Sequence, residues 1–260
     1  MLARVREDAG SGKPLVYVPG IDGTGELLLG ARERFAAEFR LVRLRYELGP
    51  GAPPGEDDYP HLASSVVDAL DECDIGSAIL LAESFGGPLG LQIALDHPER
   101  VSALAIVNSF SHYRMRARLA LTNTVMPRVP PRLARFVRRH VGPPMLMGPR
   151  RDPEMVRAFR EVEGLVFDEG YLRRARMVRG VDLRPRLGEI RCPVALFASE
   201  RDGIVDSLPQ AREMAAAIEG ATMEIIPRGG HIALPLADEP WVERIRTLAA
   251  RAEAARAVGA

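Results

Sequence analysis

The sequence is short of several residue types that would define other classes of protein. It has two cysteines among 260 residues, Cys73 and Cys192, which excludes a cysteine-rich zinc module. The two lie in different core-like segments, so we expect buried free thiols rather than a disulfide. No apolar run approaches the roughly 18 residues that a membrane-spanning helix needs. The formal net charge is zero, so nothing in the overall charge indicates a nucleic-acid partner.

The first ten residues lack the apolar stretch of a secretory signal. They include Arg4, Arg6, Glu7 and Asp8 instead. We therefore expect a cytoplasmic protein. Apolar residues make up 47% of the chain and charged residues 27%, and this length is enough for one large domain with a full hydrophobic core.

Short β-branched or leucine-rich segments alternate with longer amphipathic ones, which is typical of βα units on a mostly parallel sheet. Several predicted strands are nearly continuous apolar runs, as expected of strands covered on both faces. The predicted strands are 14–19, 41–48, 78–83, 101–108, 194–199 and 222–227, with a weaker first strand near 2–7. The predicted helices are 26–39, 61–73, 86–96, 208–219 and 240 to near the C-terminus.

The clearest chemical signal is the sequence LLAESFGG at residues 80–87, between a buried strand and a helix. In this setting G-x-S-x-G forms a tight turn that exposes a nucleophilic serine, here Ser84. The turn needs small residues two before and two after the serine, and these are Ala82 and Gly86. The amide of Phe85, at the start of the helix, is placed to stabilise an oxyanion. The alternative is a serine in an ordinary glycine-rich turn.

A second glycine-rich turn, VPGIDGTG at residues 18–25, follows the first well-defined strand. Such a turn can supply the second oxyanion amide. We assign that amide to Ile21, with Asp22 as the alternative. A phosphate-binding loop is disfavoured because no lysine follows the glycines, and the spacing G-x-G-x-x-G of a dinucleotide site is absent.

Two later segments supply an acid and a base. Asp202 lies just past a predicted strand, where an orienting carboxylate belongs; Glu200 and Asp206 are its competitors. His231 follows the last strand on a glycine turn, where a general base belongs. The chain order of serine, aspartate and histidine is that of the α/β hydrolases.

With these four motifs the sequence resembles the α/β-hydrolase superfamily over nearly its whole length. The resemblance implies an α/β fold with a mostly parallel sheet of about six to eight strands, a core of residues 1–110 and 188–260, and a helical lid at 111–187. It implies Ser84 as nucleophile, His231 as base and Asp202 as acid, Phe85 and Ile21 as oxyanion amides, and no metal or cofactor. The loop at 18–25 is similar to the hydrolase part of phytyl ester synthase and diacylglycerol acyltransferase-like proteins. We also expect Asp22, Phe110, His112 and Ile232 to bind substrate.

The lid segment, residues 111–187, has an unusual composition. It carries 18 arginines, no lysine and seven acidic residues, and it holds six of the nine methionines. Flexible thioethers suit a pocket for varied apolar ligands. A helix at 131–141 places Leu133, Phe136, Val137 and Val141 on one face. That helix either covers the active site or rests on an anionic membrane. The basic excess also suits an anionic substrate such as an acyl-CoA or a phospholipid.

Three functions compete on these residues. The first is a serine hydrolase that cleaves a small-molecule ester or thioester, with an apolar acyl chain, through an acyl-Ser84 intermediate. The second is an acyltransferase that forms lipid esters. The third is a non-catalytic ligand binder, which has no need of Ser84, Asp202 and His231 together. Dehalogenase and epoxide hydrolase chemistry is disfavoured, because those relatives place aspartate where Ser84 stands.

Overall fold

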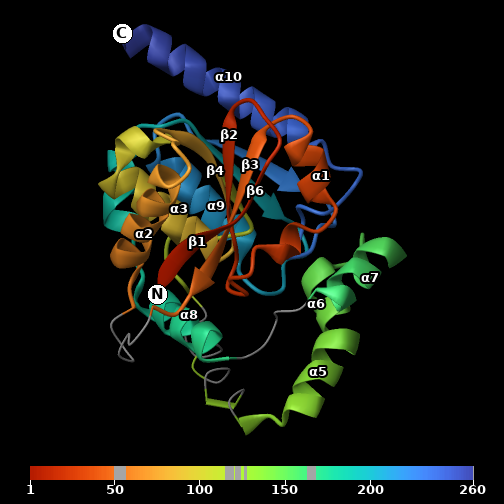
Figure 1. The fold of residues 1–260 in the computed structure, drawn as a ribbon. Coiled ribbons are helices and arrows are strands. Elements are labelled where there is room, and N and C mark those ends of the chain that lie inside the picture. Colours follow the sequence, from red (N-terminus) through yellow and green to blue (C-terminus); the bar gives the residue numbers. More distant parts are fainter. Residues whose placement is uncertain (50–56, 115–119, 121–123, 126–127, 163–167, 260) are drawn as a thin grey trace.

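The computed structural model describes residues 1–49, 57–114, 120, 124–125, 128–162 and 168–259 (Figure 1). Within these ranges one seven-stranded sheet has the strand order β1-β3-β2-β4-β5-β6-β7. Only β1 is antiparallel to its neighbour. The strands are β1 (Leu2–Ala9), β2 (Pro14–Val18), β3 (Arg40–Glu47), β4 (Ala78–Glu83), β5 (Val101–Val107), β6 (Val194–Ser199) and β7 (Thr222–Ile226). The predicted fold class, a mostly parallel sheet flanked by helices, is confirmed.

The carboxyl ends of the central strands lie at the same level of the sheet. Val18 of β2 pairs with Ala82 of β4, and Glu83 of β4 pairs with Val107 of β5. Val107 pairs in turn with Phe197 of β6. The segments that follow these strands therefore emerge at one edge, where open α/β sheets bind their ligands.

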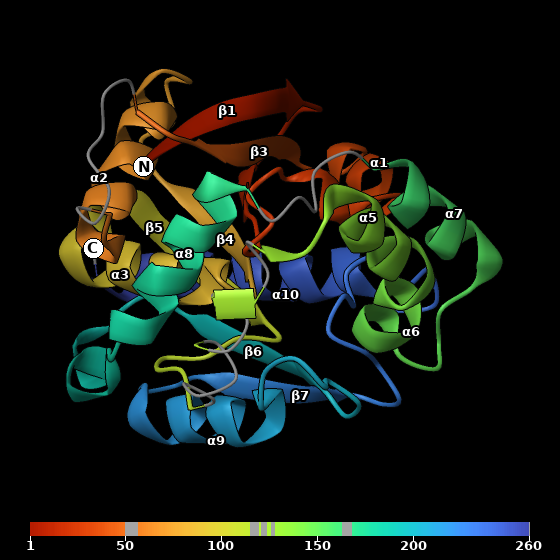
Figure 2. The same cartoon turned by 90° about the horizontal axis from the view of Figure 1, so that it is seen from below.

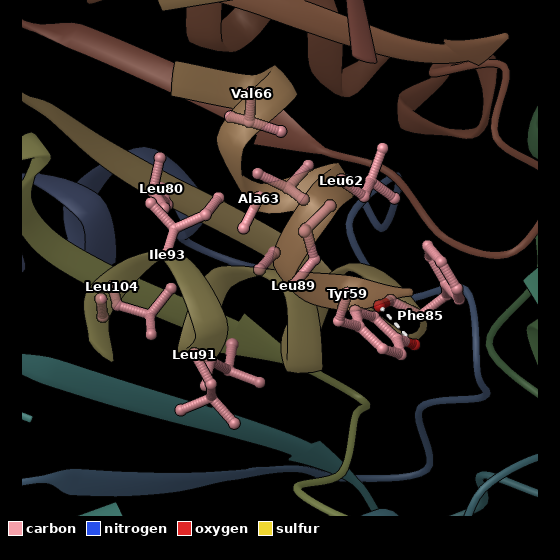
Figure 3. Packing of buried hydrophobic residues seen from close by; sticks show 14 of the residues in the cluster. Tyr59, Leu62, Ala63, Val66, Leu80, Phe85, Leu89, Leu91, Ile93 and Leu104 are labelled. Atoms are coloured by element: carbon pink, nitrogen blue, oxygen red, sulfur yellow. Dashed lines mark hydrogen bonds between the residues drawn. The ribbon is translucent and has the colours of Figure 1, made fainter. Parts of the chain in front are cut away.

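Alternate strand residues supply two hydrophobic layers, one on each face of the sheet. Ile79 and Leu81 of β4 pack on one side with α1 and α10, whereas Leu80 and Ala82 pack on the other with α2, α3 and α9. Figure 3 shows the second layer, in which side chains of α2 and α3 lie against β4 and β5. The helices are α1 (Ala31–Ala36), α2 (Tyr59–Asp71), α3 (Gly86–Asp96), α9 (Ser207–Ala217) and α10 (Trp241–Gly259).

Two expectations need correction. The predicted helix 26–39 is broken into a short 3₁₀ turn, Glu26–Leu28, and the single-turn helix α1. Leu29 causes the break, because its φ of 46° is incompatible with a continuous right-handed helix. Cys73 and Cys192 are free, as expected, but they are half-buried rather than fully buried.

In the described part of the chain between β5 and β6, four α-helices are present: α5 (Pro131–His140), α6 (Gly142–Met147), α7 (Pro153–Glu161) and α8 (Glu169–Gly180). All four lie on one side of the sheet, below it in Figure 1 and toward the viewer in Figure 2. The segment leaves and rejoins the core at neighbouring points, where the Leu183 amide donates to the Ser111 carbonyl oxygen at 3.0 Å. We interpret this segment as a lid inserted into the core.

Aspartates set the first turns of two of these helices. The side chain of Asp152 accepts from the Met155 amide, and that of Asp168 accepts from the Tyr171 amide, each at 2.7 Å. Three of the lid methionines are buried, Met147, Met155 and Met177, while Met115 and Met126 lie outside the described residues. None of the helices in the described part of the chain is long and apolar enough to cross a bilayer.

Candidate active site

The turn between β4 and α3 holds Ser84 in a backbone conformation that favours glycine. Its φ is 54°, a strained value for a side-chain-bearing residue. The turn also passes very close to β2, because a Cβ on Gly86 would stand 2.2 Å from the carbonyl oxygen of Val18. On the other side, the Ala82 Cβ lies 3.1 Å from the position that a Cβ on Gly90 would take. Close backbone packing thus explains the small residues around Ser84.

Three segments far apart in the sequence bring Ser84, His231 and Asp202 together. His231 Nε2 lies 2.9 Å from Ser84 Oγ, and His231 Nδ1 lies 2.9 Å from Asp202 Oδ2. The imidazole of His231 and the side chain of Ser84 are both almost completely buried. A serine hydroxyl, an imidazole and a carboxylate in this line form the arrangement of a catalytic triad, in which the carboxylate orients the imidazole and the imidazole can accept the proton of the serine.

The structure places only one of the three candidate acids against His231. Asp202 Oδ1 accepts from the amides of Ile204 (2.8 Å) and Val205 (3.2 Å), and Ser207 donates its hydroxyl to Asp202 Oδ2. The competitors face other groups. Glu200 accepts from the Arg228 amide at 3.0 Å, and Asp206 precedes α9 and lies 3.9 Å from Arg114.

The loop after β2 lies beside the serine. A Cβ on Gly20 would stand 3.6 Å from Ser84 Cβ and 3.4 Å from Asp22 Oδ1. In the described part of the chain, no backbone carbonyl accepts from the amide of Ile21 or of Phe85. Ile21 is our candidate for the second oxyanion donor, with the amide of Asp22 as the alternative.

Aromatic packing fixes the other candidate donor, Phe85. Its ring stacks on Tyr59, with centroids 5.0 Å apart, and meets Tyr46 edge-on at 5.6 Å. The Tyr59 hydroxyl also donates to the Phe85 carbonyl oxygen at 3.4 Å (Figure 3). These contacts restrain Phe85, the residue that we expect to supply the first oxyanion amide, and a preorganised oxyanion site requires such restraint.

An arginine of the lid segment binds the loop after β2. Arg174 of α8 donates from Nε to the Ile21 carbonyl oxygen (2.7 Å) and from Nη2 to that of Asp22 (3.0 Å). Its guanidinium lies 2.7 Å from the place where a Cβ on Gly23 would stand, and Gly23 has a φ of 70°, a backbone conformation that favours glycine. Burial lowers the pKa of Arg174, and the nearby Asp22 carboxyl partly offsets this effect. Arg174 therefore ties the lid to the loop that carries Ile21.

We expect Arg174→Met to lower kcat by about 10²-fold, the lower end of the cost of losing one oxyanion donor. KM should change little, because the loop would lose its position rather than its contacts with the ground state. Arg174→Lys should recover part of the loss. The matched control is Arg173→Met, because Arg173 is equally buried on the same helix but pairs with Asp57 and Glu169. Equal losses of kcat in both variants would show a purely structural role.

A second acid, Glu83, lies directly before the nucleophile. Burial raises the pKa of Glu83 from its usual value of 4.5 to about 7, although a hydrogen bond from Tyr17 opposes the shift. The Tyr17 hydroxyl donates to Glu83 Oε2 at 2.6 Å. Burial also raises the pKa of Asp22. The shift at Glu83 reduces the negative charge beside the point where an oxyanion would form.

The remaining predicted substrate residues have different surroundings. Phe110 lines a small hollow with Tyr113, Arg114, Val205, Asp206 and Gln210. His112 is buried against Arg114 and Glu213 rather than in that lining. The Ile232 amide donates to the Leu146 carbonyl oxygen of α6 at 2.8 Å. Ile232 therefore joins the lid to the loop between β7 and α10, residues 227–240, which carries His231 and is called the histidine loop below.

Asn108 is a residue of the site that sequence reasoning missed. Its Nδ2 lies 3.0 Å and 2.8 Å from the carbonyl oxygens of Gly230 and His231, and its Oδ1 accepts from the Ser199 amide at 2.7 Å. Asn108 thus ties the end of β5 to β6 and to the histidine loop. The signal that could have identified Asn108 in the sequence is its position directly after a predicted buried strand, where residues of the site are expected. Within the described ranges, no three His, Cys, Asp or Glu side chains are grouped to hold a metal ion.

The chain belongs to the α/β hydrolase fold family, whose sequence model matches residues 48–238. The resemblance stated from the motifs is therefore confirmed at the level of the superfamily. Among known proteins, "Putative carbamate hydrolase RutD" from Klebsiella pneumoniae (strain 342) is 29% identical over 230 residues, which cover 85% of each chain.

Solved structures share the fold over nearly the whole chain. The enol-lactonase from Burkholderia xenovorans LB400 has a TM-score of 0.78 at 20% identity and covers 95% of both chains. A thermophilic esterase from Thermogutta terrifontis has a TM-score of 0.80 at 20% identity, over 96% of this chain and 93% of the esterase. At these identities the likeness supports the fold alone.

Proposed function

We propose that the protein is a serine hydrolase that cleaves a carboxylic ester or thioester through an acyl-Ser84 intermediate. One observation carries the proposal: the unbroken line from Ser84 Oγ through the imidazole of His231 to Asp202, with both distances at 2.9 Å. A protein that only binds a ligand has no need of this line.

In the acylation half-reaction, His231 Nε2 takes the proton of Ser84 as Oγ attacks the substrate carbonyl carbon. Asp202 accepts from Nδ1–H and stabilises the imidazolium that forms. The amides of Phe85 and Ile21 donate to the oxyanion of the tetrahedral intermediate. His231 then protonates the leaving alcohol or thiol as its bond to the carbonyl carbon breaks, which leaves the acyl group on Ser84.

The second half-reaction repeats these roles with a new nucleophile. His231 removes a proton from water, the hydroxyl adds to the acyl carbon, and Ser84 leaves with the proton from His231. The products are a carboxylic acid and the free enzyme. An alcohol in place of water would give a new ester, which is how the same site would act as an acyltransferase.

The comparisons support an ester-like substrate. The relatives are named as carbamate hydrolase, lactonase and esterase, and each of these names implies attack on a carbonyl carbon that carries a heteroatom leaving group. We further propose an apolar acyl chain, because the lid segment holds six of the nine methionines and flexible thioethers suit a pocket for varied apolar ligands.

The test is to trap the intermediate with a panel of substrates. The panel contains p-nitrophenyl esters from acetate to palmitate, an acyl thioester and an N-methylcarbamate, and each reaction is quenched within one turnover. We expect mass spectrometry to find the acyl mass on the peptide that contains Ser84, with faster acylation by the longer esters. A long-chain alcohol is then added, and the ratio of new ester to free acid is measured.

Three outcomes would count against the proposal. An acyl group on another residue would contradict the assignment of Ser84. A strict preference for acetate would contradict the apolar chain. More new ester than acid at a low alcohol concentration would identify an acyltransferase instead.

A further inference from the structure

The amphipathic helix α5 leaves its apolar face uncovered. Leu133, Phe136, Val137 and Val141 are 50%, 57%, 37% and 47% exposed. At the spacing i, i+3, i+4 and i+8 these side chains share one face of the helix. Met145, one turn further on in α6, is 46% exposed. One of the two sequence-based alternatives was that this face covers the active site. In this structure the face is exposed instead and does not cover the site.

We propose that this face, made by Leu133, Phe136, Val137, Val141 and Met145, docks on an anionic lipid membrane. An apolar patch of this kind on a solvent-exposed helix face indicates an interaction surface. Of the exposed large hydrophobic side chains in the described chain, only Leu48 and Ile225 lie outside the lid segment. The exposure is therefore concentrated on one helical lobe, residues 128–162.

The charge of this lobe selects the anionic lipid surface over other occupants. Residues 128–162 contain nine arginines and three acidic residues. Arg150 attaches the lobe to the core, because it pairs with Asp238 and Glu239 in the segment before α10. By contrast, Arg132, Arg139, Arg151 and Arg160 have no acidic side chain within ion-pair distance among the described residues. Lipid phosphates can pair with such arginines, whereas a second copy of this basic lobe would repel them.

The position of the lobe connects membrane docking to the candidate site. The C-terminal end of α6 abuts the histidine loop: the Leu146 carbonyl oxygen accepts from the Ile232 amide, and a Cβ on Gly230 would stand 2.3 Å from the Met147 carbonyl carbon. Figures 1 and 2 show α5 and α6 together at the side of the sheet where α8 also lies. Docking of α5 would therefore bring the His231 loop toward the bilayer, from which an apolar substrate can be delivered.

Vesicle flotation tests the proposal without any measurement of activity. The Ser84→Ala protein is mixed with vesicles of phosphatidylcholine alone or of phosphatidylcholine with phosphatidylglycerol. We expect binding to the anionic vesicles, weakened at least tenfold in about 1 M NaCl, where the screening length is about 3 Å. Leu133→Ser/Phe136→Ser should lower the partition coefficient at least about tenfold. Arg132→Gln/Arg139→Gln should lower it by a similar factor, for the anionic vesicles only.

The matched control is Leu48→Ser/Ile225→Ser, which removes the two exposed hydrophobic side chains outside the lid segment and should leave binding unchanged. Circular dichroism checks that all variants are folded. The proposal is overturned if the protein does not float with anionic vesicles, or if the Leu133/Phe136 and Leu48/Ile225 variants lose binding equally. A dimer in gel filtration that the Leu133/Phe136 variant dissociates, together with absent vesicle binding, would assign the face to a second copy. Because the protein tested lacks Ser84, failure here leaves the proposed hydrolase activity untouched.

Discussion

Replacing Ser84 with alanine is expected to lower kcat by about 10⁶-fold and to abolish labelling by a fluorophosphonate. The magnitude follows from losses measured when the nucleophile of a serine triad is removed. Folding should be unaffected or slightly improved, because the strained backbone at φ 54° is no harder for alanine to adopt and one buried hydroxyl is lost. Gel-based labelling, ester turnover and thermal unfolding measure the three quantities.

The control for this substitution is Ser64→Ala. Ser64 is an exposed serine of α2 whose hydroxyl donates to the Pro60 carbonyl oxygen, so labelling and turnover should remain at the level of the unchanged protein. Full labelling of the Ser84→Ala protein would show that the reactive nucleophile is another residue. If the Ser84→Ala protein fails to unfold cooperatively, labelling is measured on Ser84→Gly, which also removes the hydroxyl and suits the φ of 54°.

The local parts of the site were predictable because each is a short pattern at the end of a strand. The tight turn around Ser84 needs small neighbours for steric reasons, and Ala82 and Gly86 satisfy that need within five residues of sequence. The glycine turn before His231 is equally local. Chain order then restricted the acid to the segment after β6, but the choice of Asp202 over Asp206 depends on which carboxylate the turn aims at the imidazole.

The residues that hold the site in place were not predictable, because their partners are distant in sequence. Arg174 contacts carbonyl groups about 150 positions earlier in the chain, and no local pattern distinguishes it from the other lid arginines. The hydrogen bonds of Asn108 form only after the end of β5 has packed against β6 and the histidine loop. The same limit applies to the broken helix after β2, where the backbone of Leu29 follows tertiary packing rather than its helix propensity.

Strand boundaries came closer to the predicted ones than helix boundaries did. Strand β4 is an apolar run that ends at the tight turn around Ser84, so sequence and structure share the same limits, 78–83. The apolar face of α5 was also correctly located on the helix, since a period of 3.6 residues fixes it. What surrounds this face could not be predicted, because periodicity shows which residues share a face but not what covers that face.

Asp202→Asn is expected to lower kcat by about 10⁴-fold while KM and folding change little. The asparagine keeps the shape of the side chain, and its oxygen can still accept from the amides of Ile204 and Val205. Its NH₂ group then faces His231 Nδ1 and favours the tautomer that carries the proton on Nε2. That tautomer cannot accept the proton of Ser84. Steady-state kinetics measure the loss, and ¹⁵N NMR of the imidazole reports the tautomer.

Asp206→Asn and Glu200→Gln are the matched controls, because each removes one carboxylate charge from the same loop region without touching His231. Both should keep kcat within about threefold of the unchanged protein, as expected of charges that lie away from the reacting atoms. Ser207→Ala should give an intermediate loss, because it removes one donor to Asp202 Oδ2 but leaves the carboxylate in place. If Asp206→Asn costs more than Asp202→Asn, the orienting acid has been assigned to the wrong residue, and the His231–Asp202 contact is structural rather than part of the proton transfer.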